Sequence, residues 1–121
     1  MPDSQDPISL QQTLRQHRAF AEFSEGALER LVASSPIVVF APEEILVRQG
    51  DASDAAFFVL DGEVEVIAES SFGAVPLARL PAHSLIGDIG VLADLPRTAT
   101  LRAGNSVSVM RIGRDSLLQA G

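Results

Sequence analysis

Between residues 37 and 112 the chain contains seven short runs of β-forming residues in close succession. They are IVVF (37–40), ILV (45–47), AAFFVL (55–60), EVEVIA (63–68), VPLARL (75–80), TATLRA (98–103) and SVSVMRI (106–112). The segments between them, such as QGDASDA (49–55) and ESSFGA (69–74), are rich in the Gly, Asp and Ser residues that favour turns. Many short strands at this spacing are typical of a sandwich or barrel, so the sequence predicts a mainly β fold.

The pair Asp61-Gly62 separates two of these runs. An Asp-Gly pair between β-forming runs predicts a hairpin, because a type I′ turn needs positive φ at both central positions. The run that follows, 63–68, alternates glutamate with valine, so one face of that strand is expected to be wet and the other dry.

Helical patterns flank the β-rich part on both sides. Residues 8–32 carry apolar side chains at helical spacing in two short segments, and Ser24 is placed to cap the second. After the last β-forming run, GRDSLLQAG (113–121) predicts a turn and the first turn of another helix, which would begin near Asp115 or Ser116. Helices are therefore expected at both ends of the β structure.

The composition limits the class of protein. A chain of 121 residues with 46% hydrophobic residues is expected to form one domain with a packed core. Its net charge of −7 argues against non-specific binding to nucleic acid or anionic lipid, so an anionic ligand would need a locally positive pocket. The lack of cysteine excludes disulfides, thiolate metal sites and a cysteine nucleophile, and it suits a reducing cytosol. Because no apolar run is long enough to span a bilayer and no signal-peptide pattern is present, we expect a cytoplasmic protein without a membrane span.

The stretch IGDIGVLADLPRTATLRA (86–103) is the best candidate for a ligand site. If a short helix follows Gly87, its first N–H groups would form an anion site, and Asp88 could accept hydrogen bonds from sugar hydroxyls. Arg97 would bring a planar fork that suits two phosphate oxygens. The same residues also fit a simple turn in which Arg97 forms a surface ion pair with Asp88 or Asp94. The residues alone leave both interpretations open.

Three stretches together resemble the cyclic nucleotide-binding domain family, the regulatory module of catabolite activator proteins, cyclic-nucleotide-dependent protein kinases and cyclic-nucleotide-gated channels. EEILVRQGD (43–51) is similar to the family's G-E-x-I-x-x-x-G-D turn and strand, and AAFFVLDGEVEVI (55–67) to its x-x-G-x-V-x-V hairpin. The stretch at 86–103 is similar to its phosphate-binding cassette, F-G-E-x-A-L-L-x-x-x-P-R-x-A-x-V-x-A. Asp88 and Arg97 stand nine positions apart, as the Glu and Arg of the kinase form do. The resemblance covers roughly residues 20–118, nearly the whole chain.

The resemblance implies a β-roll, which is a jelly-roll-like double-stranded β-helix of about eight strands, with a short helix inside the cassette and flanking helices. It divides the chain into an N-terminal helical extension at 1–19 and the cyclic nucleotide-binding domain at 20–121. The family closes its pocket with a C-terminal lid helix, and only the beginning of such a helix fits after residue 112. We therefore expect the lid to be truncated or absent and the chain to be a piece of a larger regulated protein.

The resemblance also implies a set of ligand-binding residues. They are Gly87, Asp88, Ile89, Gly90, Arg97, Thr98 and Ala99. Arg97 would bind the exocyclic phosphate with help from the amides of Ile89 and Gly90, and Asp88 would hold the ribose 2′-hydroxyl. Thr98 could reach the phosphate or the base edge, and in some members a threonine at this position favours cGMP.

The chain departs from the family pattern at four positions. Asp88 stands where the cassette has glutamate, and its side chain is shorter by one methylene. Ile86 replaces the phenylalanine of the cassette, while His83 and Glu43 stand where the family has glycine.

Two functions compete. The first is a regulatory module that binds cAMP or cGMP, needs no cofactor, and signals allosterically to an attached effector domain or a protein partner, with a homodimer possible. The second is a degenerate domain of the same fold that binds no nucleotide and serves as a structural or protein-interaction module.

Catalysis is not expected, because neither His17 nor His83 has metal-ligand spacing and no P-loop or G-x-S-x-G motif occurs. DNA binding is not expected either, because no helix-turn-helix fits after residue 112.

Overall fold

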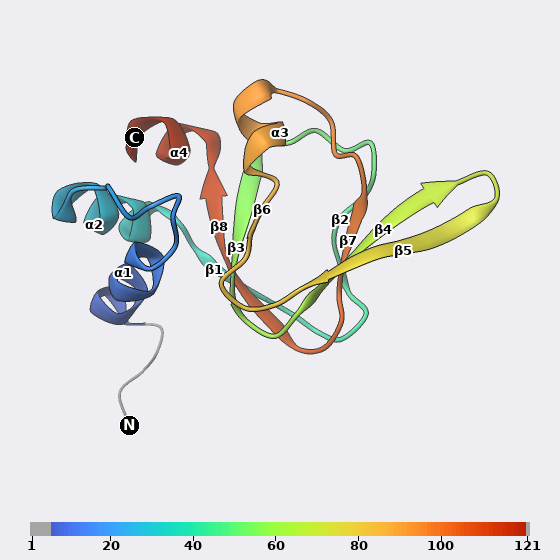
Figure 1. Cartoon of the computed structure of the whole chain (residues 1–121), viewed down its shortest axis with the longest axis horizontal. Helices are drawn as coiled ribbons and strands as arrows, with labels where there is room; N and C mark the ends of the chain where they lie inside the picture. Colours follow the sequence, from blue (N-terminus) through green and yellow to red (C-terminus); the bar gives the residue numbers. More distant parts are fainter. Residues whose placement is uncertain (1–5, 121) are drawn as a thin grey trace.

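Eight strands and four helices make up the described part of the chain, residues 6–120 of a computed structural model (Figure 1). The helices are α1 (Pro7–Arg15), α2 (Glu25–Ser34), α3 (Asp88–Ala93) and α4 (Arg114–Ala120). The strands are β1 (Ile37–Phe40), β2 (Ile45–Val47), β3 (Ala55–Asp61), β4 (Val64–Ser70), β5 (Gly73–Leu80), β6 (Leu85–Ile86), β7 (Thr100–Ala103) and β8 (Val107–Gly113). All seven β-forming runs became strands, and the two-residue strand β6 was not predicted.

The strands form two antiparallel sheets of four, in the orders β1-β8-β3-β6 and β2-β7-β4-β5. One core fills the space between the sheets and includes Val59, Val64 and Leu101, all nearly fully buried. A second core lies between the first sheet and the helices, and it includes Leu14 and Phe58. Strand β3 contributes to both cores, which explains why its sequence, AAFFV, is apolar on both faces. The mainly β architecture with flanking helices, a β-roll, is therefore confirmed.

The hairpin predicted at Asp61-Gly62 is wrong. Strand β3, which ends at Asp61, pairs with β8 and β6, whereas β4 pairs with β5 and β7 in the other sheet. The pair therefore carries the chain from one sheet to the other. Gly62 has a φ of +87°, but Asp61 is not among the residues with positive φ, so the type I′ geometry is absent from this turn. The hairpin is formed by β4 and β5, with Ser71 and Phe72 at its tip.

The flanking helices begin where the sequence places suitable caps. The side chain of Ser24 accepts the N–H of Ala27 at 3.1 Å, which confirms it as the cap of α2. The side chain of Asp6 accepts the N–H of Ser9 at 2.8 Å, and this hydrogen bond lowers the pKa of Asp6 below its ordinary value. The predicted C-terminal helix is present and begins at Arg114.

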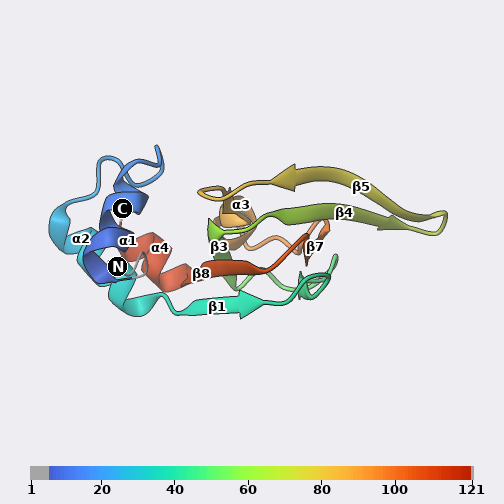
Figure 2. The same ribbon diagram turned by 90° about the horizontal axis from the view of Figure 1, so that it is seen from below.

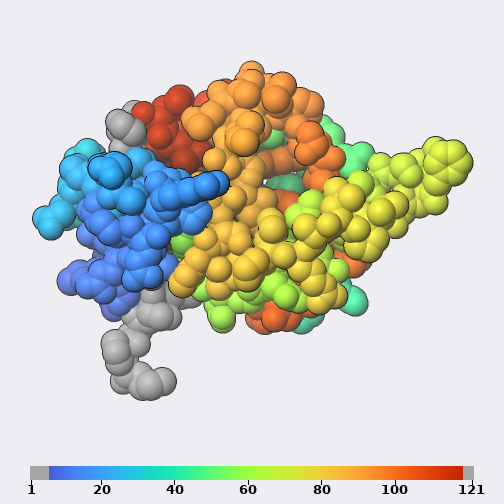
Figure 3. All heavy atoms as spheres, in the orientation of Figure 1, coloured from blue at the N-terminus to red at the C-terminus, as the bar shows by residue number. Residues whose placement is uncertain are grey.

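Helices α1, α2 and α4 gather at one end of the molecule, and the β4–β5 hairpin extends at the other (Figure 2). Helix α2 packs against both α1 and α4, and α3 packs against β3 and α4. The space-filling view shows the hairpin projecting beyond the body, and Phe72 at its tip is fully exposed (Figure 3). None of the helices in residues 6–120 is long and apolar enough to cross a membrane.

Two residues with side chains, at positions where the resembled family pattern has glycine, take a left-handed backbone here. Glu43 has a φ of +73° and His83 a φ of +71°. This conformation costs a residue with a side chain about 1–2 kcal/mol. The N–H of Glu43 donates to the carbonyl of Ala103 at 2.8 Å, and the N–H of His83 donates to that of Val59 at 2.6 Å. These hydrogen bonds to β7 and β3 therefore hold both residues in the left-handed conformation despite its cost in free energy.

Candidate functional site

The predicted short helix is present as α3, and its start depends on Gly87. This residue is the N-cap of the helix and has a φ of +82°, a conformation that side-chain-bearing residues rarely adopt. The carbonyl of Gly87 accepts the N–H of Val91 at 3.1 Å, and Val91 is fully buried. At the other end of α3, Asp94 takes a φ of +56° as the C-cap. The helix is thus about one and a half turns long, and the N–H groups of its first residues have no partner within the helix.

Arg97 folds back toward this N-terminus and is only 7% exposed. Its Nη2 donates to the carbonyl of Ala55, and its guanidinium carbon lies 5.7 Å from the centre of the Phe57 ring. Its main chain is paired with the β2–β3 loop, because its N–H donates to Asp51 and its carbonyl accepts from Gly50, each at 2.8 Å. Backbone and side chain are therefore both held in place.

Gly87 is also required by the position of Arg97. A Cβ atom at residue 87 would collide with Nη1 of the guanidinium. The close approach brings the positive charge of Arg97 to the amide end of α3, and the two form one corner of the site, which Asp88 of the first turn also lines. Glycine is therefore required at position 87 for two reasons: the positive φ of the backbone, and the closeness of Arg97, which leaves no room for a Cβ atom.

The surface ion pair considered for Arg97 is wrong. Asp94 instead pairs with Arg114, at 2.8 Å between Oδ1 and Nη2. Within the described residues Arg97 has no carboxylate partner, and its buried Nε makes no hydrogen bond. Burial lowers the pKa of the Arg97 guanidinium below its ordinary value, and the charges of Asp54 and Asp51 partly oppose this effect. Because an arginine stays protonated near neutral pH, Arg97 is a buried cation that no described carboxylate contacts directly.

A cavity of about 340 Å³ lies over this corner. This volume is within the roughly 300–1,000 Å³ of small-molecule sites. It is lined by Ser53, Gly87, Asp88, Ile89, Gly90, Leu95, Pro96, Arg97 and Thr98. Six of the seven predicted ligand-binding residues are among these, and the seventh, Ala99, is buried outside the lining. Asp88 is half-buried, whereas Thr98 is exposed at the mouth.

Ser53 is a lining residue that sequence reasoning missed. It is 5% exposed, and its Oγ has no hydrogen-bond partner in the part of the chain that the structure describes. A Cβ atom on Gly90 would lie 2.9 Å from this Oγ, so the hydroxyl sits directly against α3. A small polar residue in a Gly/Asp/Ser-rich turn carries no signal of its own, and only the fold brings it to the cavity.

The cassette is connected to the helical end of the molecule through Arg114. Its Nε donates to the carbonyl of Val91 at 2.9 Å, and its Nη2 binds Asp94. Arg114 is the first residue of α4, and Ser116 of the same helix lies 2.9 Å from Ser34 of α2, hydroxyl to hydroxyl. A movement of α3 would therefore change the contacts of α4 and, through α4, those of α2.

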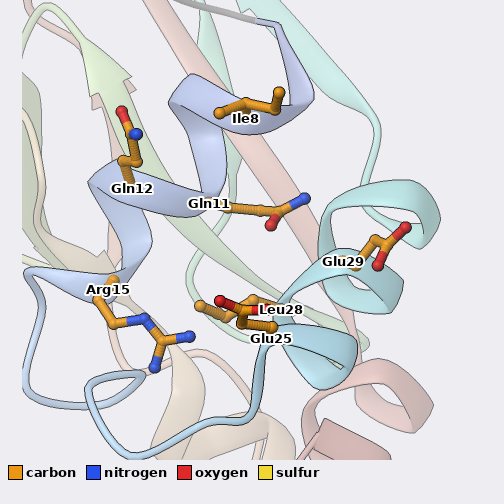
Figure 4. A pocket seen from close by; sticks show the side chains of 7 residues that line it. All are labelled: Ile8, Gln11, Gln12, Arg15, Glu25, Leu28 and Glu29. Carbon is orange, nitrogen blue, oxygen red and sulfur yellow. The ribbon is translucent and has the colours of Figure 1, made fainter.

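A second hollow, of about 350 Å³, lies between α1 and α2 (Figure 4). Its charged side chains are the exposed Glu25 and Glu29 and the half-buried Arg15, which donates to the carbonyl of Ala21 at 3.2 Å. It contains no buried polar group comparable to Ser53. No cluster of side chains suited to a metal ion occurs among residues 6–120.

Comparison with known proteins points to one family. The profile of the family described as "Cyclic nucleotide-binding domain" matches residues 37–120. A cyclic nucleotide-gated cation channel protein of Drosophila melanogaster is 33% identical over 107 residues, which cover 87% of this chain and 15% of the channel protein. The cAMP-dependent protein kinase regulatory subunit of Yarrowia lipolytica is 35% identical over 77 residues, 64% of this chain and 20% of the kinase protein. The chain thus spans a fifth or less of the length of these curated relatives.

Solved structures share the fold over nearly the whole chain. The sensor domain of the transcriptional regulator DNR from Pseudomonas aeruginosa superimposes with a TM-score of 0.88 at 22% identity, covering 94% of this chain and 77% of that one. The regulatory domain of Toxoplasma gondii PKA, solved with cAMP, gives a TM-score of 0.89 at 20% identity and covers 99% and 46%. The shared fold, the cassette with its buried arginine and the profile match over more than half of the sequence lead to one conclusion: this chain belongs to the cyclic nucleotide-binding domain family.

Proposed function

We propose that this chain binds cAMP or cGMP in the cavity over α3 and passes the binding event to the helices at its end. The observation that carries the proposal is Arg97, a buried cation that has an unpartnered Nε and no carboxylate partner in the described structure. Leaving a buried charge uncompensated is costly, and a phosphate is the group that compensates it best.

The residues around Arg97 complete a site for a sugar phosphate. The amides of Ile89 and Gly90 at the start of α3 would add hydrogen bonds to the phosphate. Asp88 would accept from a ribose hydroxyl, and Thr98 at the mouth would contact the phosphate or the base. The Oγ of Ser53 would gain the hydrogen-bond partner that it lacks.

Transmission would run through Arg114. Its contacts with Val91 and Asp94 hold α4 to the C-terminal end of α3. A ligand that shifts α3 would change these contacts, and α4 would respond together with α2. We propose a regulatory role on this basis, with an effector domain or protein partner as the recipient of the signal.

Calorimetry with cAMP, cGMP and cyclic dinucleotides on this chain and on Arg97→Ala tests the proposal. We expect heat of binding with cAMP or cGMP and its loss in the variant. A folded sample that releases no heat with any of these ligands would instead support a structural or protein-interaction module. Binding that survives the loss of Arg97 would remove its phosphate role even if the ligand is right.

The shorter acid at position 88 is tested in the same assay. We expect Asp88→Glu to tighten binding by a few-fold, because the longer side chain extends further toward a ribose hydroxyl. Unchanged or weaker affinity would show that the cavity is fitted to aspartate.

A further inference from the structure

Asp54 forms an ion pair with Arg111, and its charge also acts on Arg97. It directly precedes Ala55, whose carbonyl accepts a hydrogen bond from Arg97 Nη2, and its charge raises the pKa of the Arg97 guanidinium against the larger effect of burial. Its Oδ2, however, pairs with Nη2 of Arg111 at 3.1 Å. The carboxylate next to the buried arginine is therefore held by a different arginine.

Arg111 reaches Asp54 because of the strand register. It stands on β8 directly opposite Phe57 on β3. Residues opposite each other in an antiparallel pair share one face of the sheet. The guanidinium of Arg97 lies against the ring of the same Phe57. Both arginines therefore approach the start of β3 from the same face.

The ion pair between Arg111 and Asp54 is exposed to water and adds little to the free energy of unfolding. The two side chains are 41% and 72% exposed, and ion pairs in such surroundings contribute little to folding. A carboxylate brought onto the buried Arg97 would interact more strongly with the guanidinium, because the surroundings there are less polar, but it would also lose its hydration. The pair with Arg111, which leaves Asp54 in contact with water, is the one that the structure shows. Without Arg111 the exposed pairing is lost, and the nearest remaining cation whose pKa the charge of Asp54 influences is Arg97, where the carboxylate would compete with a bound phosphate.

The other acid near Arg97 is held away as well. Asp51 Oδ2 accepts the N–H of Arg48 at 2.9 Å, inside its own turn. The carboxylates of Asp51 and Asp54 thus each have a different partner, and the guanidinium of Arg97 is left facing the cavity.

We propose that Arg111 is a positioning residue that keeps Asp54 away from Arg97 and so keeps the phosphate site open. This inference rests on the proposed function, because the open site is assigned to a cyclic nucleotide. Arg111 itself is absent from the lining of the cavity, so the proposed role is exerted through Asp54. Its own positive charge also acts on Arg97 directly and lowers the pKa of that guanidinium, after the larger effect of burial.

Calorimetry with cAMP and cGMP at low ionic strength tests this role on four variants: Arg111→Gln, Arg111→Lys, Asp54→Asn and the double variant of Arg111→Gln with Asp54→Asn. We expect Arg111→Gln to weaken binding about tenfold and Arg111→Lys to restore most of it. Asp54→Asn should stay within about threefold of the parent, and the double variant should match it. Arg79→Gln is the matched control, because Arg79 forms a comparable exposed pair with Glu63 on the other sheet and should leave the affinity unchanged.

Two results would overturn the inference. One is an equal loss of affinity from Arg111→Gln with and without Asp54, and the other is no loss in either background. If the parent chain binds neither nucleotide, the proposed function fails. The side-chain Nε–Hε NMR signal of Arg97, assigned with Arg97→Lys, then tests separately whether Asp54 moves to Arg97 when Arg111 is removed. That signal must shift in Arg111→Gln and return in the double variant; a signal that does not move rejects the competition between Asp54 and the ligand site.

Discussion

Arg97 and Arg102 lie five positions apart, and each has a buried Nε without a hydrogen-bond partner in the described structure. Their surroundings differ. Arg102 on β7 stands opposite Glu65 on β4, and its Nη2 lies 3.3 Å from Oε2 of that acid, which is only 15% exposed. Arg97 binds a main-chain carbonyl and an aromatic ring, and it faces a cavity.

The difference shows how one residue type serves two purposes. An arginine with its own acid on the next strand is neutralised within the sheet, so its role is structural. An arginine that is buried without an acid destabilises the empty protein, and it is tolerated where a ligand supplies the negative charge. The lack of a counter-ion, more than burial, distinguishes the candidate binding residue.

The largest expected effect comes from removing each arginine in turn. Arg97→Ala should weaken cyclic nucleotide binding on the order of 100-fold or more, because two charge-assisted hydrogen bonds are lost. Arg102→Ala should leave affinity within about threefold and lower the free energy of unfolding by about 1–2 kcal/mol, since Glu65 loses its partner. Calorimetry measures the first effect. Urea unfolding followed by circular dichroism measures the second, because the chain has no Trp or Tyr. Equal loss of affinity in both variants would break the comparison.

The next effect comes from filling the space beside Arg97. Gly87→Ala places a Cβ against the guanidinium, whereas Gly73→Ala meets nothing within 4 Å, although both glycines have positive φ. Both variants should lose about 1–2 kcal/mol of stability from backbone strain. Only Gly87→Ala should also weaken binding, on the order of tenfold, because it displaces Arg97. The same loss of affinity in Gly73→Ala would show that the steric argument is wrong.

A smaller effect is expected at the buried hydroxyls. Ser53 and Ser35 are each 5% exposed with an unpartnered Oγ in the described structure, but only Ser53 lines the cavity over α3. Changing either to alanine should leave stability unchanged or slightly higher, because an unsatisfied buried polar group is removed. Ser53→Ala should weaken nucleotide binding about three- to tenfold, and Ser35→Ala should not change it. Calorimetry on both variants provides the check, and equal affinities would remove Ser53 from the site.

The smallest effect concerns backbone strain outside the cavity. Glu43→Gly should raise the free energy of unfolding by up to about 1.5 kcal/mol, since it removes about 1–2 kcal/mol of backbone strain and costs about 0.5–1 kcal/mol in the conformational entropy of the chain. His83→Gly should raise the free energy of unfolding by less, because the stacking of the His83 ring on Phe58, at 6.0 Å between centroids, is lost. Neither variant should alter nucleotide affinity. A change in affinity for His83→Gly would place that loop within the site.

Local patterns predicted most of the elements, and long-range pairing decided how they are combined. The β-forming runs and the cap at Ser24 depend on neighbours in the sequence, and they were predicted. Gly62 does take the positive φ expected of a turn, but the partner of a strand depends on which other strands bury its side chains. Asp61-Gly62 therefore became a crossing between sheets instead of a hairpin.

In the candidate site, too, some residues could be predicted from local sequence and others were found only in the folded structure. Gly87, Asp88 and Arg97 were predicted because they are close in sequence and their spacing is distinctive. Ser53 comes from a turn more than thirty residues earlier, and Arg111 from a strand after the cassette, so no local pattern joins them to it. Their contributions became visible only through burial, register and missing hydrogen bonds.

The sequence by itself determined the residue types of this protein: apolar runs that must form a two-sheet core, a glycine that permits a left-handed start for α3, and an arginine at fixed spacing from an acid. The tertiary structure alone decided which charges are neutralised. Asp54, Asp94 and Glu65 each pair with another arginine, and Arg97 is left buried without one among the described residues. Ion pairing depends on distances across strands and on exposure to water, and a linear chain specifies neither until it folds.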